Sequence, residues 1–322
     1  MTFHVKRTLV SQINIEGCSG DYVRLQGCNT QSIEMSLNNI VMAGLPKSGK
    51  TTFLAALWHL VHADEVHTAL RFHSLKKGDY SHLNTIAKRW RDAEPQIRTD
   101  LRLPKFVQMN LVDSTGHEIE LSFPDLSGEA YRIMWEMRKC TSDVNSTLQE
   151  GGSLLLFVHA NRIKRPLWIT EERQQMETLG LEVADEGRQE LSWQPSISPT
   201  QVTLVDIIQL MQGAPLDYTP AKIAIGLSAW DTVAEEGRRP DEFLRTELPL
   251  LSQYLLSFFG PDRFRVYGVS AQGDEIEEMT APLRPKAAAL RAKDVPSERI
   301  IMVDQHGNRS NDLTEFLAWF VC

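Results

Sequence analysis

One short segment of the sequence carries residues suited to binding a polyphosphate. Residues 44–51 are Gly-Leu-Pro-Lys-Ser-Gly-Lys-Thr, which fits the phosphate-loop pattern G-x-x-x-x-G-K-[ST]. Gly44 and Gly49 let the chain bend, so that main-chain N–H groups from Lys47 onward converge on one anion. We therefore predict that a nucleotide is bound by Gly44, Lys47, Ser48, Gly49, Lys50, Thr51 and Thr52.

The residues on either side supply the strand and helix that such a loop requires. Residues 39–43 are a short apolar run suited to a buried parallel strand, and residues 52–61 have a helix-forming composition. Lys50 is then placed to reach the β- and γ-phosphates as a catalytic charge, and the Thr51 hydroxyl is placed to ligate Mg²⁺. An accidental match in a glycine-containing turn is the alternative, which the flanking elements disfavour.

A second candidate site follows a predicted β-hairpin. Residues 105–112 and 117–123 are extended runs around an Asp-Ser-Thr-Gly turn, and the second run continues into residues 124–129, Pro-Asp-Leu-Ser-Gly-Glu. Asp125 suits a carboxylate of the Mg²⁺ shell, and Gly128 suits an N–H that meets a γ-phosphate oxygen in a mobile switch. The alternative is a turn without a metal-binding role.

The composition limits the class of partner. The chain has 322 residues, of which 42% are hydrophobic and 24% are charged, so it can form a large core. A net charge of −8 argues against nucleic-acid binding, because sequence-independent binding needs a dominant basic face. We expect a protein or small-molecule partner and no direct nucleic-acid contact.

The sequence predicts a cytoplasmic protein without a membrane span. The longest apolar candidate, residues 248–259, is interrupted by proline and polar residues and falls short of the roughly 20 residues that cross a bilayer. Residues 1–7 carry charge with no apolar core after them, unlike a signal peptide.

Cysteine and histidine do not predict a metal site. Cys18 and Cys28 both follow glycine, but two thiols at this spacing do not complete a zinc site, so we interpret them as free cysteines. His59 and His62 lie i,i+3 on one predicted helix face without carboxylates at ligand spacing, and we interpret them as surface or half-buried residues.

Further elements are predicted from apolar spacing. Residues 80–93 favour a helix with Leu83, Ile86, Ala87 and Trp90 on one side, and residues 153–159 favour a central strand buried on both faces. Another helix is expected at 200–211, capped by Thr200, with a buried face of Val202, Val205, Ile208 and Met211. The remaining expected elements are strands at 222–227 and 263–269, a helical segment at 241–259 and a terminal helix at 312–322.

This order, together with the phosphate loop, predicts an α/β P-loop NTPase fold with a mostly parallel sheet, helices on both faces and one antiparallel hairpin strand. Residues 1–36 are predicted to be an N-terminal β extension and residues 37–322 the P-loop domain. We expect a helical insertion in the first switch region at 64–104 and a further insertion at 161–199, where prolines interrupt a polar stretch.

Two strand ends give the chain its resemblance to the small-GTPase (Ras/Arf-like) branch. Residues 228–231 are Ser-Ala-Trp-Asp, and Ser270-Ala271 follows the last predicted strand; that branch carries N-K-x-D and S-A-K there. The resemblance implies that Asp231 accepts hydrogen bonds from guanine N1 and N2 and that the Ala271 N–H donates to O6. Ser228 stands in place of asparagine and Ala229 in place of lysine, while Trp230 either stacks on the base or packs in the core.

Within that branch the chain resembles the bacterial double-GTPase-like (DO-GTPase) families. The resemblance covers residues 37–322 and is carried by the phosphate loop, by Phe-Pro-Asp-Leu-Ser-Gly-Glu and by Pro-Thr-Gln-Val-Thr-Leu-Val-Asp. It implies a GTPase of a multi-gene conflict or antiviral defence system, with a protein partner from the same gene cluster.

Two more residues are expected to govern hydrolysis. Glu129 stands where the small-GTPase pattern has the glutamine that orients the attacking water, which predicts slow hydrolysis that a partner accelerates. Thr99 is the best-placed threonine for the first switch, where it would bind Mg²⁺ and sense the γ-phosphate.

The sequence thus favours a GTP-hydrolysing switch with Mg²⁺ and GTP or GDP as ligands. A nucleotide-binding scaffold with little turnover is the alternative, and a P-loop ATPase or kinase is disfavoured.

Overall fold

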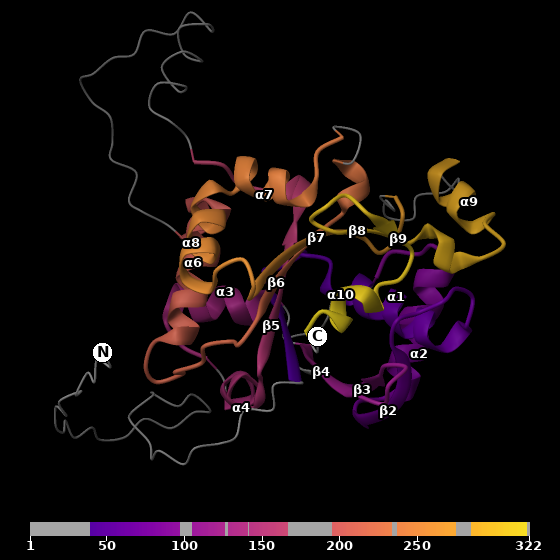
Figure 1. The fold of residues 1–322 in the computed structure, drawn as a ribbon, viewed down its shortest axis with the longest axis horizontal. Coiled ribbons are helices and arrows are strands. Elements are labelled where there is room, and N and C mark those ends of the chain that lie inside the picture. Colours follow the sequence, from indigo (N-terminus) through magenta and orange to yellow (C-terminus); the bar gives the residue numbers. More distant parts are fainter. Residues whose placement is uncertain are drawn as a thin grey trace, which may run out of the picture.

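The computed structural model describes residues 39–96, 105–125, 128–140, 142–166, 195–233, 237–274 and 285–320. In these ranges the chain forms a nine-stranded sheet in the order β2-β3-β4-β1-β5-β6-β7-β8-β9, flanked by helices (Figure 1). The strands are β1 (Asn39–Gly44), β2 (Arg71–Lys77), β3 (Lys105–Val112), β4 (Glu118–Asp125), β5 (Ser153–His159), β6 (Ile223–Ser228), β7 (Phe264–Ser270), β8 (Ile301–Val303) and β9 (Arg309–Ser310). The sheet confirms the predicted fold class.

The centre of the sheet is parallel and its borders are antiparallel. β4, β1, β5, β6 and β7 run in the same direction, while β3 pairs antiparallel with both β4 and β2. At the other border β8 pairs antiparallel with β7 and β9 antiparallel with β8. The prediction contains one antiparallel strand, whereas the described sheet has antiparallel pairings at both borders. The strands beyond the prediction are β2, β8 and β9. β2 is a polar edge strand, and β8 and β9 have only three and two residues, so none of them carries the long apolar run of the central strands.

The sheet separates two apolar cores. Along β5, Leu154, Leu156 and Val158 face one core while Leu155 and Phe157 face the other. Because successive side chains of a strand point to opposite faces, a continuous apolar run is needed where both faces are covered. The first core is covered by α3 (Gly128–Met137), α4 (Ser142–Glu150), α6 (Thr200–Gln212), α7 (Pro240–Glu247) and α8 (Pro249–Phe259), and the second by α1 (Lys50–Ala63), α2 (Tyr80–Arg91) and α10 (Thr314–Ala318).

Helix α2 agrees with its predicted buried face, whereas α6 differs at two residues. Leu83, Ile86, Ala87 and Trp90 are all buried, as expected. On α6, Val202 is 41% exposed, because the buried face is centred on Leu204 and Ile208, on the other side of the helix. Thr200 does not cap α6 either. Pro199 occupies the cap position, and the Thr200 hydroxyl accepts a hydrogen bond from the Lys164 N–H at 2.9 Å.

Three other segments differ from the expectation. Residues 240–259 form two helices, α7 and α8, because Pro249 starts a new helix and Leu248 before it leaves the helical region at φ −132°. The segment 64–104 contains the edge strand β2 as well as α2. The terminal helix α10 has only five residues. The predicted N-terminal extension at 1–36 lies outside the described residues.

The parallel strands bring their carboxyl ends to one edge of the sheet. The segments that leave β1, β4, β6 and β7 at this edge contain the four motifs identified in the sequence. Ligands of open α/β sheets bind outside this edge. Among the helices of the described ranges, none combines the length and apolar character needed to cross a bilayer.

Candidate nucleotide-binding site

The loop after β1 has the backbone geometry of an anion cradle. Gly44 has φ +157° and lies so close to its surroundings that a β-carbon would come within 2.5 Å of Ser48 Oγ and 2.8 Å of the Phe157 carbonyl. Gly49 caps α1 with φ 86°, and Lys47 adopts a left-handed φ of 62°. Glycine is therefore required at both predicted positions, and Lys47 holds a conformation that costs about 1 kcal/mol or more outside glycine.

Helix α1 directs its start toward this loop. The N–H groups in the first turn of a helix have no acceptor within the helix, so those of Lys50, Thr51 and Thr52 point out of its end. This end also carries the positive pole of the helix dipole, which favours a bound anion. Thr51 and Thr52 are half-buried at the base of the cradle.

Lys50 folds back over the loop. Its Nζ donates to the Gly44 carbonyl at 2.8 Å, to the Leu45 carbonyl at 3.1 Å and to Ser48 Oγ at 3.3 Å. These contacts hold the ammonium beside the converging N–H groups. The side chain predicted to meet the phosphates is thereby positioned by the loop itself.

The end of β6 packs directly against the phosphate loop. A β-carbon on Gly49 would lie 2.9 Å from Ser228 Cβ and 3.0 Å from Ser228 Oγ, and Ser228 is only 6% exposed. The small side chain of Ser228, where the family pattern has asparagine, lets the two segments approach this closely. The structure thus brings together two motifs that lie about 180 residues apart in the sequence.

Asp231 and Ser270, predicted separately, contact each other. Ser270 Oγ donates to Asp231 Oδ1, and the Gly273 N–H donates to Ser270 Oγ at 3.1 Å. Ser270 is buried and Asp231 is half-buried. The chain of hydrogen bonds fixes the Asp231 carboxylate relative to residues 270–273, which we call the base loop.

Trp230 lies in the core. Its ring is 2% exposed, packs edge-on against Phe243 at 5.4 Å between ring centres, and leaves so little room that a β-carbon on Gly268 would lie 2.4 Å away. This geometry favours the packing alternative over stacking on a base. Ala229 before it has a left-handed φ of 54°, which turns the chain between β6 and the 3₁₀ helix Trp230–Thr232.

The second predicted site is described by its backbone. β4 ends at Asp125, parallel to and beside β1, and α3 begins at Gly128 with Glu129 in its first turn. The backbone therefore places these three residues after a strand adjacent to the one that enters the phosphate loop. Thr99, the predicted switch threonine, lies outside the described residues.

Sequence reasoning identified Trp90 as a core residue and missed its contact with the base loop. The Trp90 Nε1–H donates to the Ala271 carbonyl at 2.7 Å, and Gln272 Nε2 is 3.4 Å from the Trp90 carbonyl. Trp90 lies on α2 and Ala271 follows β7, so 181 residues separate them. No sequence signal links a helix of the first insertion to this loop.

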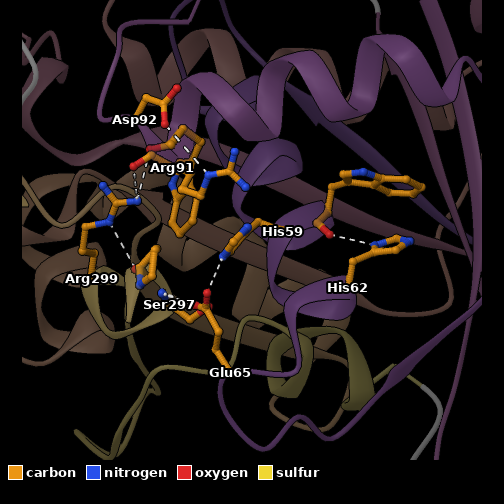
Figure 2. A network of polar contacts seen from close by, with 10 residues as sticks. His59, His62, Glu65, Arg91, Asp92, Ser297 and Arg299 are labelled. Atoms are coloured by element: carbon orange, nitrogen blue, oxygen red, sulfur yellow. Dashed lines mark hydrogen bonds and ion pairs between the residues drawn. The ribbon is translucent and has the colours of Figure 1, made fainter. Parts of the chain in front are cut away.

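A buried polar network lies beneath α2 (Figure 2). His59 on α1 contacts Glu65 at 3.2 Å, Glu65 accepts from the Ser297 N–H at 2.9 Å, and Arg299 donates to the Arg91 carbonyl at 3.0 Å. Burial lowers the pKa of His59, an effect that the Glu65 carboxylate opposes. Burial raises the pKa of Glu65, but its hydrogen bonds from Ser297 and His59 outweigh this and leave it lowered. The interpretation of both histidines as surface or half-buried residues is wrong for His59, which is buried at 9% exposure between α1 and Trp90, whereas His62 is exposed. His62 Nδ1 lies 2.8 Å from the Trp58 carbonyl.

Comparisons with known proteins identify a family. The family model described as Double-GTPase 1 matches residues 41–320. Among curated proteins no match was found. Among solved structures the chain is similar to a crystal structure of Sup35 complexed with GDP, at 12% sequence identity and a TM-score of 0.31. That match covers 80% of this chain and 45% of the other, so the chain spans less than half the length of that structure.

Proposed function

The chain belongs to the double-GTPase 1 family, and on this basis we propose that it is a guanine-nucleotide-binding switch that hydrolyses GTP slowly. The observation that carries the proposal is the meeting of four motifs at the carboxyl edge of one parallel sheet. Each motif supplies a different part of a nucleotide site.

The phosphates are assigned to the loop after β1. The left-handed Lys47, the two required glycines and the free helix start supply N–H donors, and the Lys50 ammonium supplies positive charge. The Lys50 ammonium has three N–H donors, which its contacts with Gly44, Leu45 and Ser48 occupy, so a phosphate oxygen would replace at least one of these contacts.

Guanine is assigned to Asp231 and the base loop. The Asp231 carboxylate, fixed by Ser270, accepts from the N1 and N2 hydrogens, and the Ala271 N–H donates to O6. Adenine presents the opposite pattern, with an acceptor at N1 and a donor at N6. The Asp231 carboxylate would face the N1 acceptor of adenine and form no hydrogen bond with it. Because an unpaired acceptor costs free energy, the site would bind guanine in strong preference to adenine.

Mg²⁺ fits the oxygen donors at the same edge. Thr51 stands at the start of α1 and Asp125 at the end of the neighbouring strand β4, and a hydroxyl and a carboxylate are donors that Mg²⁺ prefers. Together with Thr99 they would hold the ion, which would supply positive charge against the phosphates. The residues of the chain would hold and orient the nucleotide around it.

Hydrolysis is assigned to the segment at the start of α3. Water attacks the γ-phosphorus, the bond to the bridging oxygen breaks, and GDP and inorganic phosphate leave. The Gly128 N–H would meet a γ-phosphate oxygen, and Glu129 follows Gly128 in the first turn of α3. Because a carboxylate near the γ-phosphate adds repulsion, we expect slow turnover that a protein partner accelerates by moving this segment.

The partner is expected to come from the same multi-component bacterial system, with an antiviral defence role. Ordering of Thr99 and Gly128 by GTP would present the surface that this partner recognises. A scaffold that binds nucleotide without turnover is the second candidate, favoured by Glu129 in place of glutamine.

Nucleotide binding tests the first part of the proposal. The protein would be titrated with GTP, GDP and ATP in the presence of Mg²⁺, for the wild type, Lys50→Ala and the control Lys76→Ala. Lys76 pairs with Glu120 at the sheet border, so its substitution changes the same charge far from the loop. We expect a preference for guanine and a loss of about 10- to 100-fold in Lys50→Ala, from a lost charged hydrogen bond. Unchanged affinity of Lys50→Ala for each triphosphate, or a preference for ATP, would contradict the proposal.

Phosphate release tests the second part. We expect slow release from GTP by the wild type and release several-fold faster by Glu129→Gln, whose amide removes the repulsion. Fast release by the isolated wild type would refute slow turnover. Binding without release by both proteins would favour the scaffold.

A further inference from the structure

Trp90 connects the helix of the first insertion to the base loop. It is fully buried, and its indole N–H donates to the Ala271 carbonyl at 2.7 Å. An indole N–H is a donor only, so its direction is set by where the ring is held. The carbonyl of Ala271 is thereby fixed from α2, outside the sheet that carries the loop.

Arg299 holds the Trp90 ring from the other side. Its guanidinium lies 4.5 Å from the centre of the Trp90 ring, and its Nη2 donates to the carbonyls of Trp90 at 3.2 Å and Arg91 at 3.0 Å. Arg299 is itself 1% exposed, and a planar guanidinium stacked on an aromatic face is a rigid support. The last turn of α2 is therefore locked to the segment before β8 (Figure 2).

The base loop is held at both ends. Ser270 Oγ contacts Asp231 and accepts from Gly273 N–H on one side of Ala271, while Trp90 contacts its carbonyl on the other. Gly273 has φ +89° and approaches the Arg299 carbonyl so closely that a β-carbon would lie 2.6 Å from it. The Ala271 N–H lies between these two fixed points.

From this geometry we infer that Trp90 is a positioning residue for guanine recognition: its N–H fixes the Ala271–Gln272 peptide while Ser270 is held on the other side, and together these contacts orient the Ser270–Ala271 peptide, whose N–H meets O6 of the base. The inference rests on the proposed function, because it names the residue that orients one contact of that site. Trp90 itself does not touch the nucleotide. Its side chain acts through the hydrogen bond from the indole N–H to the Ala271 carbonyl.

Three diphosphates separate this role from a general loss of structure. GDP offers O6, N1–H and N2–H. Inosine diphosphate keeps O6 and lacks the N2 amino group, whereas 6-thioguanosine diphosphate keeps N1–H and N2–H and replaces O6 by sulfur, a weak acceptor. Only ligands with O6 depend on the orientation of the Ala271 N–H.

The test compares Trp90→Phe with Trp58→Phe. Trp58 on α1 is a matched control. It is 2% exposed, faces α2, and donates from its Nε1 to Asn84 Oδ1 on that helix at 2.9 Å. For Trp90→Phe we expect affinities for GDP and inosine diphosphate to fall by about fivefold, the scale of one lost hydrogen bond, and that for 6-thioguanosine diphosphate to stay unchanged. Trp58→Phe is expected to change none of the three.

Other outcomes overturn the inference in distinguishable ways. An equal loss for all three diphosphates would make Trp90 merely structural, and an unchanged GDP affinity would remove its role altogether. If Trp90→Phe does not fold, Arg299→Lys, which loosens the support of the ring, is expected to give the same pattern, and its absence would overturn the inference. A wild type that binds no guanine nucleotide would instead refute the proposed function.

Discussion

Gly268 is the residue on which the packing of Trp230 depends. The indole ring occupies the space where a β-carbon of residue 268 would stand, at 2.4 Å, and the surrounding strands β6 and β7 are paired and cannot move apart freely. Gly268→Ala is expected to lower the free energy of unfolding by about 1–3 kcal/mol through overpacking, measured by urea denaturation.

Gly213→Ala provides the control for that substitution. Gly213 follows α6 with φ −82°, and an added β-carbon would lie no closer than 3.4 Å to its nearest neighbour, the Gln209 carbonyl. Its free energy of unfolding is expected to change by less than about 0.5 kcal/mol. Equal effects of the two substitutions would show that the Trp230 contact does not limit residue 268.

His59 should make stability depend on pH near neutrality. Burial lowers its pKa in the folded protein, with Arg91 and Arg299 acting in the same direction and Glu65 opposing them. The neutral form is therefore favoured by folding. Its contribution is fully present above the unfolded pKa of about 6.5 and is lost as pH falls toward the lower folded value.

The substitution His59→Gln tests this dependence. The wild type is expected to lose unfolding free energy between about pH 7 and pH 5, and His59→Gln is expected to lose less over the same range. A wild-type slope retained in His59→Gln would assign the effect to other groups.

Helices α3 and α6 are joined by one carboxylate. Asp206 on α6 accepts from Trp135 Nε1 at 2.8 Å and from Arg138 Nη2 at 2.7 Å, at the end of the helix that begins with the proposed switch glycine. The Arg138 guanidinium lowers the pKa of Asp206, burial opposes this, and the Trp135 N–H assists. The far end of α3 is thus anchored, while its start carries Gly128 and Glu129 of the proposed nucleotide site.

Asp206→Ala is expected to cost about 1–3 kcal/mol of unfolding free energy, from two lost hydrogen bonds, one of them charged. Arg138→Ala should cost less than about 1 kcal/mol, since Arg138 is 53% exposed. The Asp206 contribution is present above its unfolded pKa near 4 and lost as pH falls through the lower folded value, so the variants should converge with the wild type in acid. A larger loss of unfolding free energy in Arg138→Ala than in Asp206→Ala would contradict the role of Asp206 as the anchor of α3.

The elements that could be predicted from sequence are those with local signals. The strands β1, β5, β6 and β7 have apolar runs because both of their faces are covered, and the β3–β4 turn carries its own Asp-Ser-Thr-Gly chemistry. Strand β2 was missed because it is an edge strand with charged residues that pairs only with β3. Val202 was misplaced because an apolar residue on α6 does not show which side of the helix the sheet covers.

In the candidate site, too, the features that could be predicted are those with a local sequence signal. The phosphate loop could be predicted because the pattern of Gly44, Gly49 and Lys50 reflects one continuous backbone geometry. The contact of Trp90 with Ala271 joins segments 181 residues apart, and its tryptophan looks like any other core residue of an amphipathic helix. Pairings of this kind are set by tertiary packing and leave no periodic signal.

For the molecule as a whole, hydrogen bonds tie the beginning of the predicted insertion at 161–199 to the start of α6. The Lys164 N–H donates to Thr200 Oγ1 at 2.9 Å and the Thr200 N–H donates to the Lys164 carbonyl at 3.0 Å, while Arg165 contacts Glu247 on α7. The backbone on either side of residues 167–194 is therefore held together at Lys164 and Thr200.

Replacing residues 167–194 by a short Gly-Ser linker should leave the domain folded. The entropy of closing a loop varies slowly with its length, so the free energy of unfolding is expected to change by less than about 1 kcal/mol and GDP affinity to be retained. Circular dichroism during urea denaturation and nucleotide titration would measure both. Collapse of the fold or loss of binding would show that this segment is part of the domain.

The division of the interior by the sheet has a consequence for how substitutions combine. Because alternate side chains of the same strands serve opposite layers, a change of volume under α1 is felt on one side only, and substitutions far apart without shared neighbours combine additively. Two substitutions on opposite sides of the sheet are accordingly expected to change the free energy of unfolding by the sum of their separate effects.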